Sequence, residues 1–488
     1  MSQHLFNKHR SSKYIIILTL IVGALQLAWS TEFSEATPFL LSLGISKKVL
    51  SLVWLAGPLS GTLGQPIVGM LSDRSSSRAL IVDVVPTEQQ QIANAWAARM
   101  IAIFNLIGFW IGTLNLKKLF PLLGNNQFKV LSTLVALIMS GLTFFCLYYI
   151  EERNPQTDLT LIEQRREQDD KLKELGIDPN SSTIIPQLVN FFKQIIVAFK
   201  TIPRQVKLVC YAQLFAWIGY FPLLFYTTSY VGELYLYNKG YPNPTLIPPE
   251  LKQELTDQST RVGTYALLSN SIVTLLIVTF LPSALETTSK NPIVSEKFNL
   301  RKLWIYSHIV FFLCTFMTFF ITNYKQAIIL FAFTGIPWGS AVWIPFSLIS
   351  EEISRIKDIK AIQIYYKQQI DGSNIEEDDP PEINSFNNIY CKNVLIDYYN
   401  HIEYDSGILL ALHNVFVSAP QMLSSLMSSV LFTIFHKSAT DDSYDTSLAW
   451  VFRFGGLMSF GAIYFSIKVK TNEELYEDDK LMAISSEF

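Results

Sequence analysis

The feature that most constrains the fold is a series of long apolar segments recurring from one end of the chain to the other. A helix needs about 20 mostly apolar residues to cross a bilayer core, and about ten segments meet that requirement. They are residues 14–43, 49–71, 92–116, 128–150, 208–232, 262–281, 303–321, 327–349, 407–435 and 448–469. One further apolar piece, 79–86, is too short to cross. The sequence therefore predicts an all-α polytopic membrane protein with about ten full transmembrane helices and one short fragment.

The charge of the chain agrees with a membrane environment. Only 16% of the 488 residues are charged, against about 25% in a typical soluble domain, and they gather in termini and loops. A soluble enzyme is therefore excluded. The net charge of -3 provides no basic surface for nucleic acid, so the lipid bilayer is the expected surrounding.

Charged segments divide the chain into four parts. Residues 1–150 form an amino-terminal helix bundle, and 151–206 a charged loop containing EQRREQDDKLKELG. Residues 207–470 form a six-helix carboxy-terminal bundle with an acidic insertion at 351–405, and 471–488 a tail. Lys and Arg are more frequent in the loops on the side of the N-terminus, so both termini, the charged loop and the insertion are expected in the cytosol.

Two glutamates lie in the first span. Glu32 and Glu35 are three residues apart, on one helical face, with Trp29 one turn before Glu32. A charged side chain within a bilayer usually faces a cavity or a partner. This face therefore suits a polar cavity bordered by an aromatic ring. The alternative is that both glutamates lie near the outer interface and face water.

An acid and a base occur in neighbouring segments of the first half. Asp83 lies in RALIVDVVP and Arg99 in ANAWAARM. Burial raises the pKa of a carboxyl group, so this pair is a candidate proton-coupling site. The alternatives are a structural ion pair, or an Asp83 that faces the cytosol and has no role in coupling.

Polar and aromatic residues also occur within the spans of the second half. His413 and Asn414 lie in ALHNVFVSAPQ, and PWGSAVWIPF contributes Trp338 and Trp343. Sugars are bound by hydrogen bonds and by stacking on aromatic rings, so this mixture fits a polyol cavity. The alternatives are a histidine that hydrogen-bonds between helices and tryptophans that anchor span ends.

Motifs of enzymes and ATP-driven pumps are missing from the sequence. It contains no phosphate-binding glycine loop with a lysine, no metal-ligand spacing and no nucleophile elbow. Gln65, next to Pro66 in GPLSGTLGQPIVG, is polar within a glycine-rich span, where it can contact a substrate or the backbone freed by the proline. Cys146, Cys210 and Cys314 lie in apolar segments and Cys391 in a polar loop, so we interpret them as packing residues.

Several strings resemble the sucrose and α-glucoside carriers of the glycoside, pentoside and hexuronide cation symporter group, especially its fungal members. They are LQLAWSTEFSEATPFLLSLGIS, WLAGPLSGTLGQPIVGMLSDRS, RALIVDVVPTEQQQIANAWAARM, FAWIGYFPLLFYTTSYVGELY, GIPWGSAVWIPFSLISEE, LHNVFVSAPQ and AWVFRFGGL, and they extend from the first span to the last. The resemblance implies a major facilitator fold with two six-helix bundles, alternating access, and a sugar moved together with a proton. No cofactor other than this coupling proton is implied.

The resemblance also assigns roles to single residues. Asp83 matches the acid of the fourth helix that exchanges the coupling proton, while Glu32, Gln65, Asn94 and Arg99 match polar positions of the amino-terminal half. Gly69, Asp73 and Arg74 match the start of the facilitator loop motif G-x-x-x-D-R, which latches the bundles on the cytosolic side. The basic completion of this motif is absent from the sequence.

The chain departs from the family pattern after the second span. About 20 residues separate that span from the next full one, too few for two crossings. The third helix and most of the fourth are therefore missing, which leaves the later orientation unchanged. The leading hypothesis is a proton-coupled carrier of sucrose or maltose, most simply in the plasma membrane. The alternatives are a non-transporting product or remnant of such a carrier, and sugar transport without protons.

Overall fold

A computed structural model describes residues 11–60, 90–150, 199–200, 202–242, 247–289, 298–371, 389–400, 406–436 and 444–485. Its regular elements are helices. In the first half they are α2 (Ser12–Thr31), the π-helix η1 (Glu32–Ala36), α3 (Thr37–Ser42), α4 (Lys47–Val53), α7 (Gln90–Thr113), α8 (Leu116–Leu119) and α9 (Gln127–Tyr149). In the second half they are α12 (Arg204–Asn238), α13 (Pro249–Ser289), α15 (Leu300–Met317), α16 (Tyr324–Phe333), α17 (Gly335–Asp371), η4 (Ile389–Cys391), α19 (Asn393–Asn400), α20 (Ser406–Phe435), α21 (Ser447–Lys468) and α22 (Asn472–Ser485).

The prediction of an all-α polytopic membrane protein is confirmed. Within the described residues, nine helical stretches are long and apolar enough to cross a membrane, and they match nine of the expected spans. The remaining expected span, 49–71, is described only as far as residue 60, and the short piece 79–86 lies outside the described residues.

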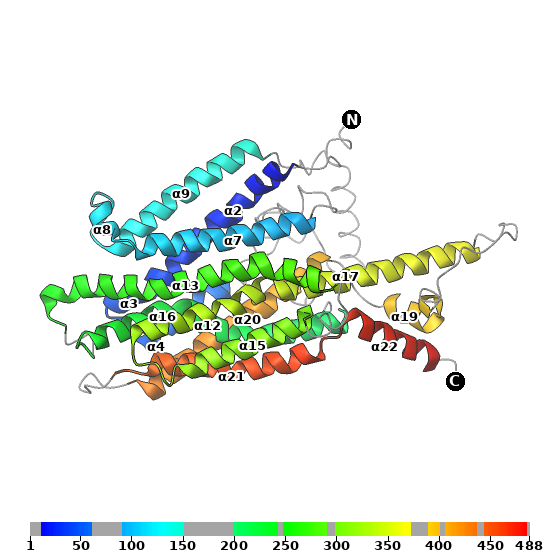
Figure 1. Ribbon diagram of the computed structural model, residues 1–488. Coiled ribbons are helices and arrows are strands. Elements are labelled where there is room, and N and C mark those ends of the chain that lie inside the picture. Colours follow the sequence, from blue (N-terminus) through cyan, green and yellow to red (C-terminus); the bar gives the residue numbers. More distant parts are fainter. Residues whose placement is uncertain are drawn as a thin grey trace, which may run out of the picture.

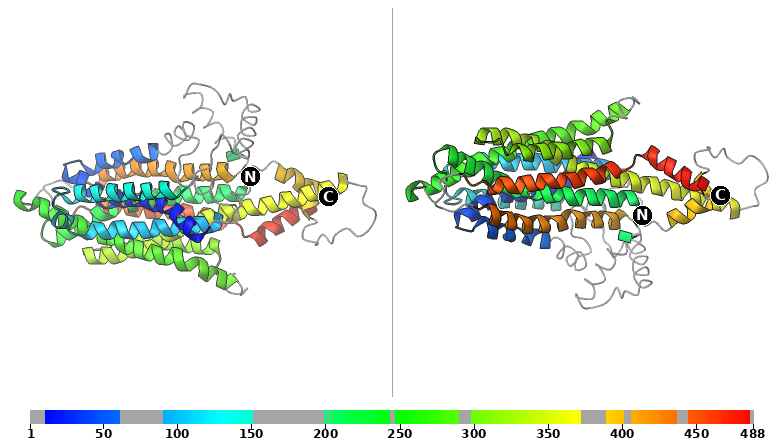
Figure 2. Two further views of the ribbon diagram at one scale, coloured as in Figure 1. Left: turned by 90° about the horizontal axis from the view of Figure 1, so that it is seen from above. Right: turned by 90° about the horizontal axis from the view of Figure 1, so that it is seen from below.

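The long helices run along one common axis in all three views (Figures 1 and 2). We call the end at which α2 begins and α21 ends the terminal end; α22 also lies there (Figure 1). The opposite end, at which α4 begins and α12 ends, is the distal end. Several helices begin at a side chain that accepts a hydrogen bond from the first turn, as Ser46 does from Val49 N at the start of α4.

The helices form an amino-terminal and a carboxy-terminal group. In the first, α2 packs against both α7 and α9. In the second, α12 lies in the middle and packs against α13, α20 and α21. Aromatic side chains of α12 fill this core, and Tyr220, Tyr226 and Tyr230 are each almost completely buried.

One close approach between helices in the second group depends on two glycines. A Cβ atom added to Gly219 of α12 would lie 2.7 Å from the carbonyl oxygen of Gly455 on α21. Small residues let helix backbones come this close in a membrane, where dispersion contacts rather than water drive helix association. The pair therefore fixes the distance between α12 and α21.

The terminal end carries a small helical assembly beyond the bundle. The long helix α17 extends past the other spans, and α22 continues outward beyond α21 to lie beside α17 and α19 (Figure 1). Ile356, Ile359, Leu395 and Ala483 form part of its apolar core. The tail segment 472–485 is thus helical and packed.

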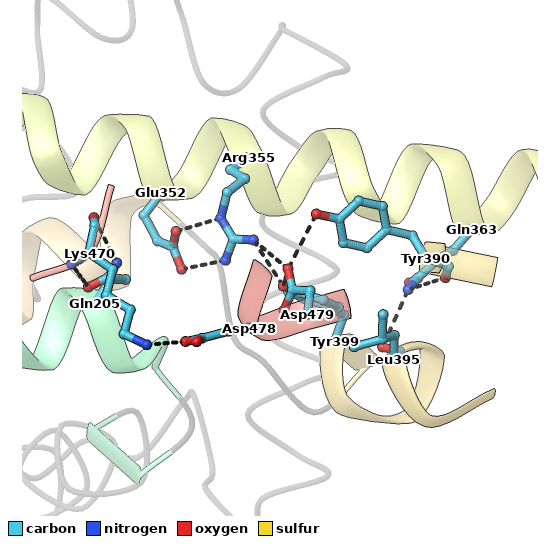
Figure 3. A network of polar contacts seen from close by, with 10 residues as sticks. All are labelled: Gln205, Glu352, Arg355, Gln363, Tyr390, Leu395, Tyr399, Lys470, Asp478 and Asp479. Atoms are coloured by element: carbon cyan, nitrogen blue, oxygen red, sulfur yellow. Dashed lines mark hydrogen bonds and ion pairs between the residues drawn. The ribbon is translucent and has the colours of Figure 1, made fainter. Parts of the chain in front are cut away.

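A polar network holds this assembly together (Figure 3). Arg355 of α17 makes two hydrogen bonds to Glu352, at 2.8 and 3.1 Å, and one to Asp479 of α22 at 3.0 Å. The hydroxyl groups of Tyr399 and Tyr390 donate to the same Asp479 carboxylate, at 2.8 and 3.3 Å. One guanidinium thus connects a transmembrane helix, the insertion and the tail.

Candidate functional site

The amino-terminal site candidates lie on α2, η1 and α7, or outside the described part. Gln65, Gly69, Asp73, Arg74 and Asp83 lie outside the described residues. Asn94 lies on α7, but its side chain is also outside the description. The hypotheses for these residues, including the pairing of Asp83 with Arg99, therefore stay predictions.

Arg99 is half-buried on α7 and lies above an aromatic ring. Its guanidinium carbon is 5.2 Å from the centre of the Trp96 ring, within the range of a cation–π contact. One further polar contact links α7 to the first span: the Gln26 side chain donates to Asn105 Oδ1 at 2.9 Å. α2 and α7 are thus joined by a polar contact as well as by apolar packing.

The two glutamates of the first span differ in their surroundings. Both belong to η1, a five-residue π-helix inserted between α2 and α3. Glu32 is half-buried and follows Trp29, which is 39% exposed. Glu35 is only 3% exposed, so it does not merely face water, in contrast to the alternative drawn from the sequence. Short π-helical turns occur frequently at functional sites.

In the carboxy-terminal group, the structure separates His413 from Asn414. His413 is fully buried, 3.4 Å from the Gln213 side chain of α12, and its ring meets the edge of Phe346. Asn414 is exposed. Adjacent helical positions point about 100° apart, so these two residues face different surroundings. His413 connects α20, α12 and α17, which is the interhelical arrangement left open by the sequence.

Trp338 belongs to an aromatic cluster in the middle of the second group. Its ring meets Trp217 at 5.7 Å and Tyr220 at 5.8 Å, both nearly perpendicular. Beside Trp338 and Asn270 lies a cavity of about 10 Å³, with room for roughly one water molecule. This cavity is too small for a sugar.

Sequence reasoning missed the charged cluster at the distal end. The ammonium group of Lys47, at the start of α4, lies 2.8 Å from Glu233 of α12 and 2.9 Å from Asp445 before α21. All three side chains are largely buried, with exposed fractions between 14% and 23%. Burial alone lowers the pKa of Lys47, but the Glu233 and Asp445 carboxylates outweigh it and raise that pKa.

Serine side chains extend this distal connection between the two groups. Ser425 and Ser429 of α20 donate to the backbone carbonyls of Ser51 and Lys48. Thr228 of α12 donates to the carbonyl of Phe33 in η1. The hydrogen bonds that join the two groups within the described part of the chain all lie toward the distal end. The hydrogen bonds between the two groups thus gather at one end, while α7 and α13 also pack against each other.

The geometry can be compared with known proteins. No family model matches the chain. It is 26% identical to the general alpha-glucoside permease of Schizosaccharomyces pombe across 93% of each chain. It is 21% identical to sucrose transport protein SUC3 of Arabidopsis thaliana across 71% of this chain and 78% of that one. The chain is a homologue of the α-glucoside and sucrose carriers.

Two further comparisons concern a local match and a solved structure. A segment of 64 residues is 38% identical to sucrose transport protein SUT1 of rice. Among solved structures, the chain is similar to the partially occluded inward open conformation of the xylose transporter XylE from E. coli. The TM-score is 0.47 and the identity 11%, over 94% of this chain and 98% of that one.

The alignment with the fission-yeast permease also bears on chain length. It extends over 588 positions, whereas this α-glucoside carrier homologue has 488 residues. At least 100 aligned positions therefore lie opposite gaps in this chain. The segment between the second span and α7, where the sequence predicts a missing hairpin, lies mostly outside the described residues.

Proposed function

We propose that the chain is a proton-coupled carrier that moves α-glucosides such as sucrose or maltose across a membrane by alternating access. The observation that carries this proposal is the pair of helix groups joined by hydrogen bonds at the distal end. A carrier of this kind alternates by rocking one group against the other around a central site. The relatives named as an alpha-glucoside permease and a sucrose transport protein support a disaccharide as the cargo.

The residues proposed for this function follow the sequence hypotheses. Asp83 and Arg99 are the proposed coupling pair, and the substrate contacts are Glu32, Gln65, Asn94, Trp338, His413 and Asn414. Gly69, Asp73 and Arg74 are the proposed latch on the cytosolic side. The plasma membrane, cytosolic termini, the four-part division of the chain and the absence of a cofactor belong to the same proposal.

Uptake of radiolabelled maltose and sucrose into cells tests the function. The experiment compares acidic with neutral medium, and each with and without a proton uncoupler. The proposal predicts faster uptake in acidic medium and loss of the stimulation with the uncoupler. Uptake that is insensitive to the uncoupler would instead establish transport without protons. In Asp83→Asn, with the protein still at the membrane, proton-dependent uptake is expected to be lost.

A second candidate function is sugar binding without transport. The short stretch between the second span and residue 92, too short for two crossings, favours it, because a carrier lacking a hairpin has an incomplete amino-terminal group. Restoring an in-frame hairpin between Ser77 and Arg78 discriminates the two candidates. Transport only by the restored chain supports the second one, whereas equal transport by both chains supports the first.

A further inference from the structure

Glu35 is a buried carboxyl group with incomplete partners. Only 3% of the residue is exposed, and its Oε1 atom has no hydrogen-bond partner. The hydroxyl group of neighbouring Thr37 is also buried and unpartnered. An ionised carboxylate needs water, a cation or several donors to offset the free-energy cost of burial. Glu35 therefore lies in an environment that favours its neutral, protonated form.

The Gln127 amide beside Glu35 is already engaged by the backbone. Its Nε2 group donates to the carbonyls of Gly112 and Leu114, at 3.1 and 2.8 Å. The Gln127 Oε1 atom accepts from Leu116 N at 3.2 Å and keeps a second lone pair. An O–H group on Glu35 can use such an acceptor, whereas a carboxylate cannot.

The charged groups that face Glu35 come from the opposite helix group. The π-helix η1 packs against α12 and α13, so Glu35 lies where the two groups meet. Asp257 and Arg261 of α13 act on it with opposite signs, and Lys117 offsets the charge of Asp257. Within the described residues, the Arg261 guanidinium makes no ion pair with Glu35 within 4 Å. On its own element the charged neighbour of Glu35 is Glu32. The contacts of α7 and α12 with adjacent η1 residues are uncharged: Gly112 lies beside Ser34, and Thr228 donates to the Phe33 carbonyl.

We propose that Glu35 is a proton-binding site that must be occupied before the distal end can close. The inference rests on the proposed carrier function and deepens it, because it names the group that links closure to a proton. In the open state, a hydronium ion at the distal side gives its proton to the Glu35 carboxylate. One O–H bond of the hydronium ion breaks as the carboxyl O–H bond forms, one water molecule is left, and the carboxyl charge changes from -1 to zero.

Release of the proton needs a route toward the terminal end. Glu32 lies about one helical turn nearer that end and is half-buried, so water reaches it more readily than Glu35. The proton of Glu35 passes to water beside Glu32 when η1 and α13 separate, which restores the carboxylate. Glu35 thus takes up its proton from the distal side and gives it up toward the terminal side in each cycle.

The test uses the full chain in proteoliposomes with radiolabelled maltose. Glu35→Gln keeps the size of the side chain and resembles the protonated form. We expect this variant to retain counterflow exchange without a pH gradient, but to lose gradient-driven accumulation. Glu250→Gln, the same change at an exposed site of α13, serves as the matched control and is expected to behave as wild type.

The outcomes separate this inference from the proposed function. Accumulation by Glu35→Gln with the wild-type pH dependence would overturn the role of Glu35 while leaving the carrier function intact. Absence of counterflow in the wild-type chain would overturn the carrier function, and the inference with it.

A measurement on the wild-type chain remains decisive if Glu35→Gln does not fold. Dicyclohexylcarbodiimide reacts with protonated carboxyl groups in apolar surroundings, and mass spectrometry of the peptides locates the adduct. We expect Glu35 to be modified at neutral pH. Modification of Glu32 with an unmodified Glu35 would contradict the inference.

Discussion

Lys47 contacts two carboxylates that are far away in the sequence. Glu233 is 186 positions from it and Asp445 is 398 positions away. Neither residue attracts notice in the sequence, because each lies near a span end, where charges are common. Only the packing of α4 against α20, and of η1 against α12, brings the three together. The sequence therefore could not predict this distal cluster.

Replacing Lys47 by methionine is expected to loosen the distal end. The change leaves Glu233 and Asp445 buried without their cation, which costs about 2 kcal/mol and raises the open fraction roughly 30-fold. A Thr37→Cys background reports the opening, because Thr37 is fully buried and its hydroxyl group has no partner. Faster labelling of this cysteine by a membrane-impermeant maleimide is the expected result.

Lys48→Met, at an exposed neighbouring position, is the matched control and should be labelled at the rate of the background. Equal labelling rates in Lys47→Met and Lys48→Met would contradict the role of Lys47 in holding the distal end closed.

The stabilisation provided by the ion pair of Lys47 and Asp445 is limited to a defined range of pH. Burial raises the pKa of Asp445, but Lys47 and the Ser447 backbone lower it more, so its folded value lies below 3.8. The contribution of Asp445 is thus present above pH 3.8 and is lost as the pH falls through the lowered pKa. Lys47, with its pKa raised above 10.5, contributes below that pH and loses its effect at higher pH.

The Asp445→Asn variant tests this range. In thermal unfolding in detergent, we expect the variant to have a free energy of unfolding about 1 kcal/mol below that of wild type. This difference should be constant between about pH 5 and 9. The difference from wild type should shrink as the pH falls below 3.8, through the lowered pKa of Asp445. A difference that grows toward acid would contradict the assignment, since the wild-type carboxylate is then losing its charge.

For single site residues, the sequence predicted the surroundings of a side chain better than the particular residues that it contacts. It identified His413 and Trp338 as notable, and both lie in buried clusters between helices. It placed Asn414 with His413, but helix geometry turns Asn414 outward to an exposed position. It could not decide whether Glu35 faces water, because that depends on α12 and α13 covering η1.

At the scale of elements, the packing of α12 against α21 depends on the missing side chains of Gly219 and Gly455. Gly219→Ala places a methyl group 2.7 Å from the Gly455 oxygen and 2.7 Å from the Phe311 ring. Overpacking of this kind costs about 1–3 kcal/mol, so a lower unfolding temperature is expected. Gly141→Ala in α9 meets nothing within 4 Å and should be neutral or stabilising. Equal effects of both changes would contradict the close approach.

The assembly at the terminal end depends on Asp479. Asp479→Asn removes the negative charge that accepts hydrogen bonds from Arg355, Tyr390 and Tyr399. We expect the free energy of unfolding to fall by about 1–2 kcal/mol. Faster reaction of the buried cysteines with a thiol-reactive dye during heating measures it. Asp478→Asn is the matched control, because its ion pair with Lys470 is 37–45% exposed and such pairs contribute little. Identical melting of both variants would show that the network does not stabilise the tail helix.

The sequence predicted the tail only as a charged segment, although it is helical and packed in the structure. Helix α22 has charged residues on most faces, so its periodicity does not reveal a buried side. Its buried residues, Asp479 and Ala483, contact α17 and α19, which are distant in the sequence. Tertiary contacts therefore decide the position of this helix.

At the scale of the whole molecule, the apolar segments predicted the fold well. Nine expected spans match helices, because segments of about 20 apolar residues have few alternatives in a bilayer. The sequence could not predict at which end of the molecule the hydrogen bonds between the two groups gather. That property depends on side chains from both groups meeting at the distal end, as Lys47 and Asp445 do.

Gradient-driven accumulation of radiolabelled maltose in proteoliposomes tests the central claim most directly. The purified full chain is reconstituted, and the internal maltose concentration is compared with an acidic exterior, with equal pH, and with an acidic exterior plus an uncoupler. We expect accumulation above the external concentration only with the intact pH gradient. Equilibration to the external concentration under all three conditions, or no entry at all, would contradict it.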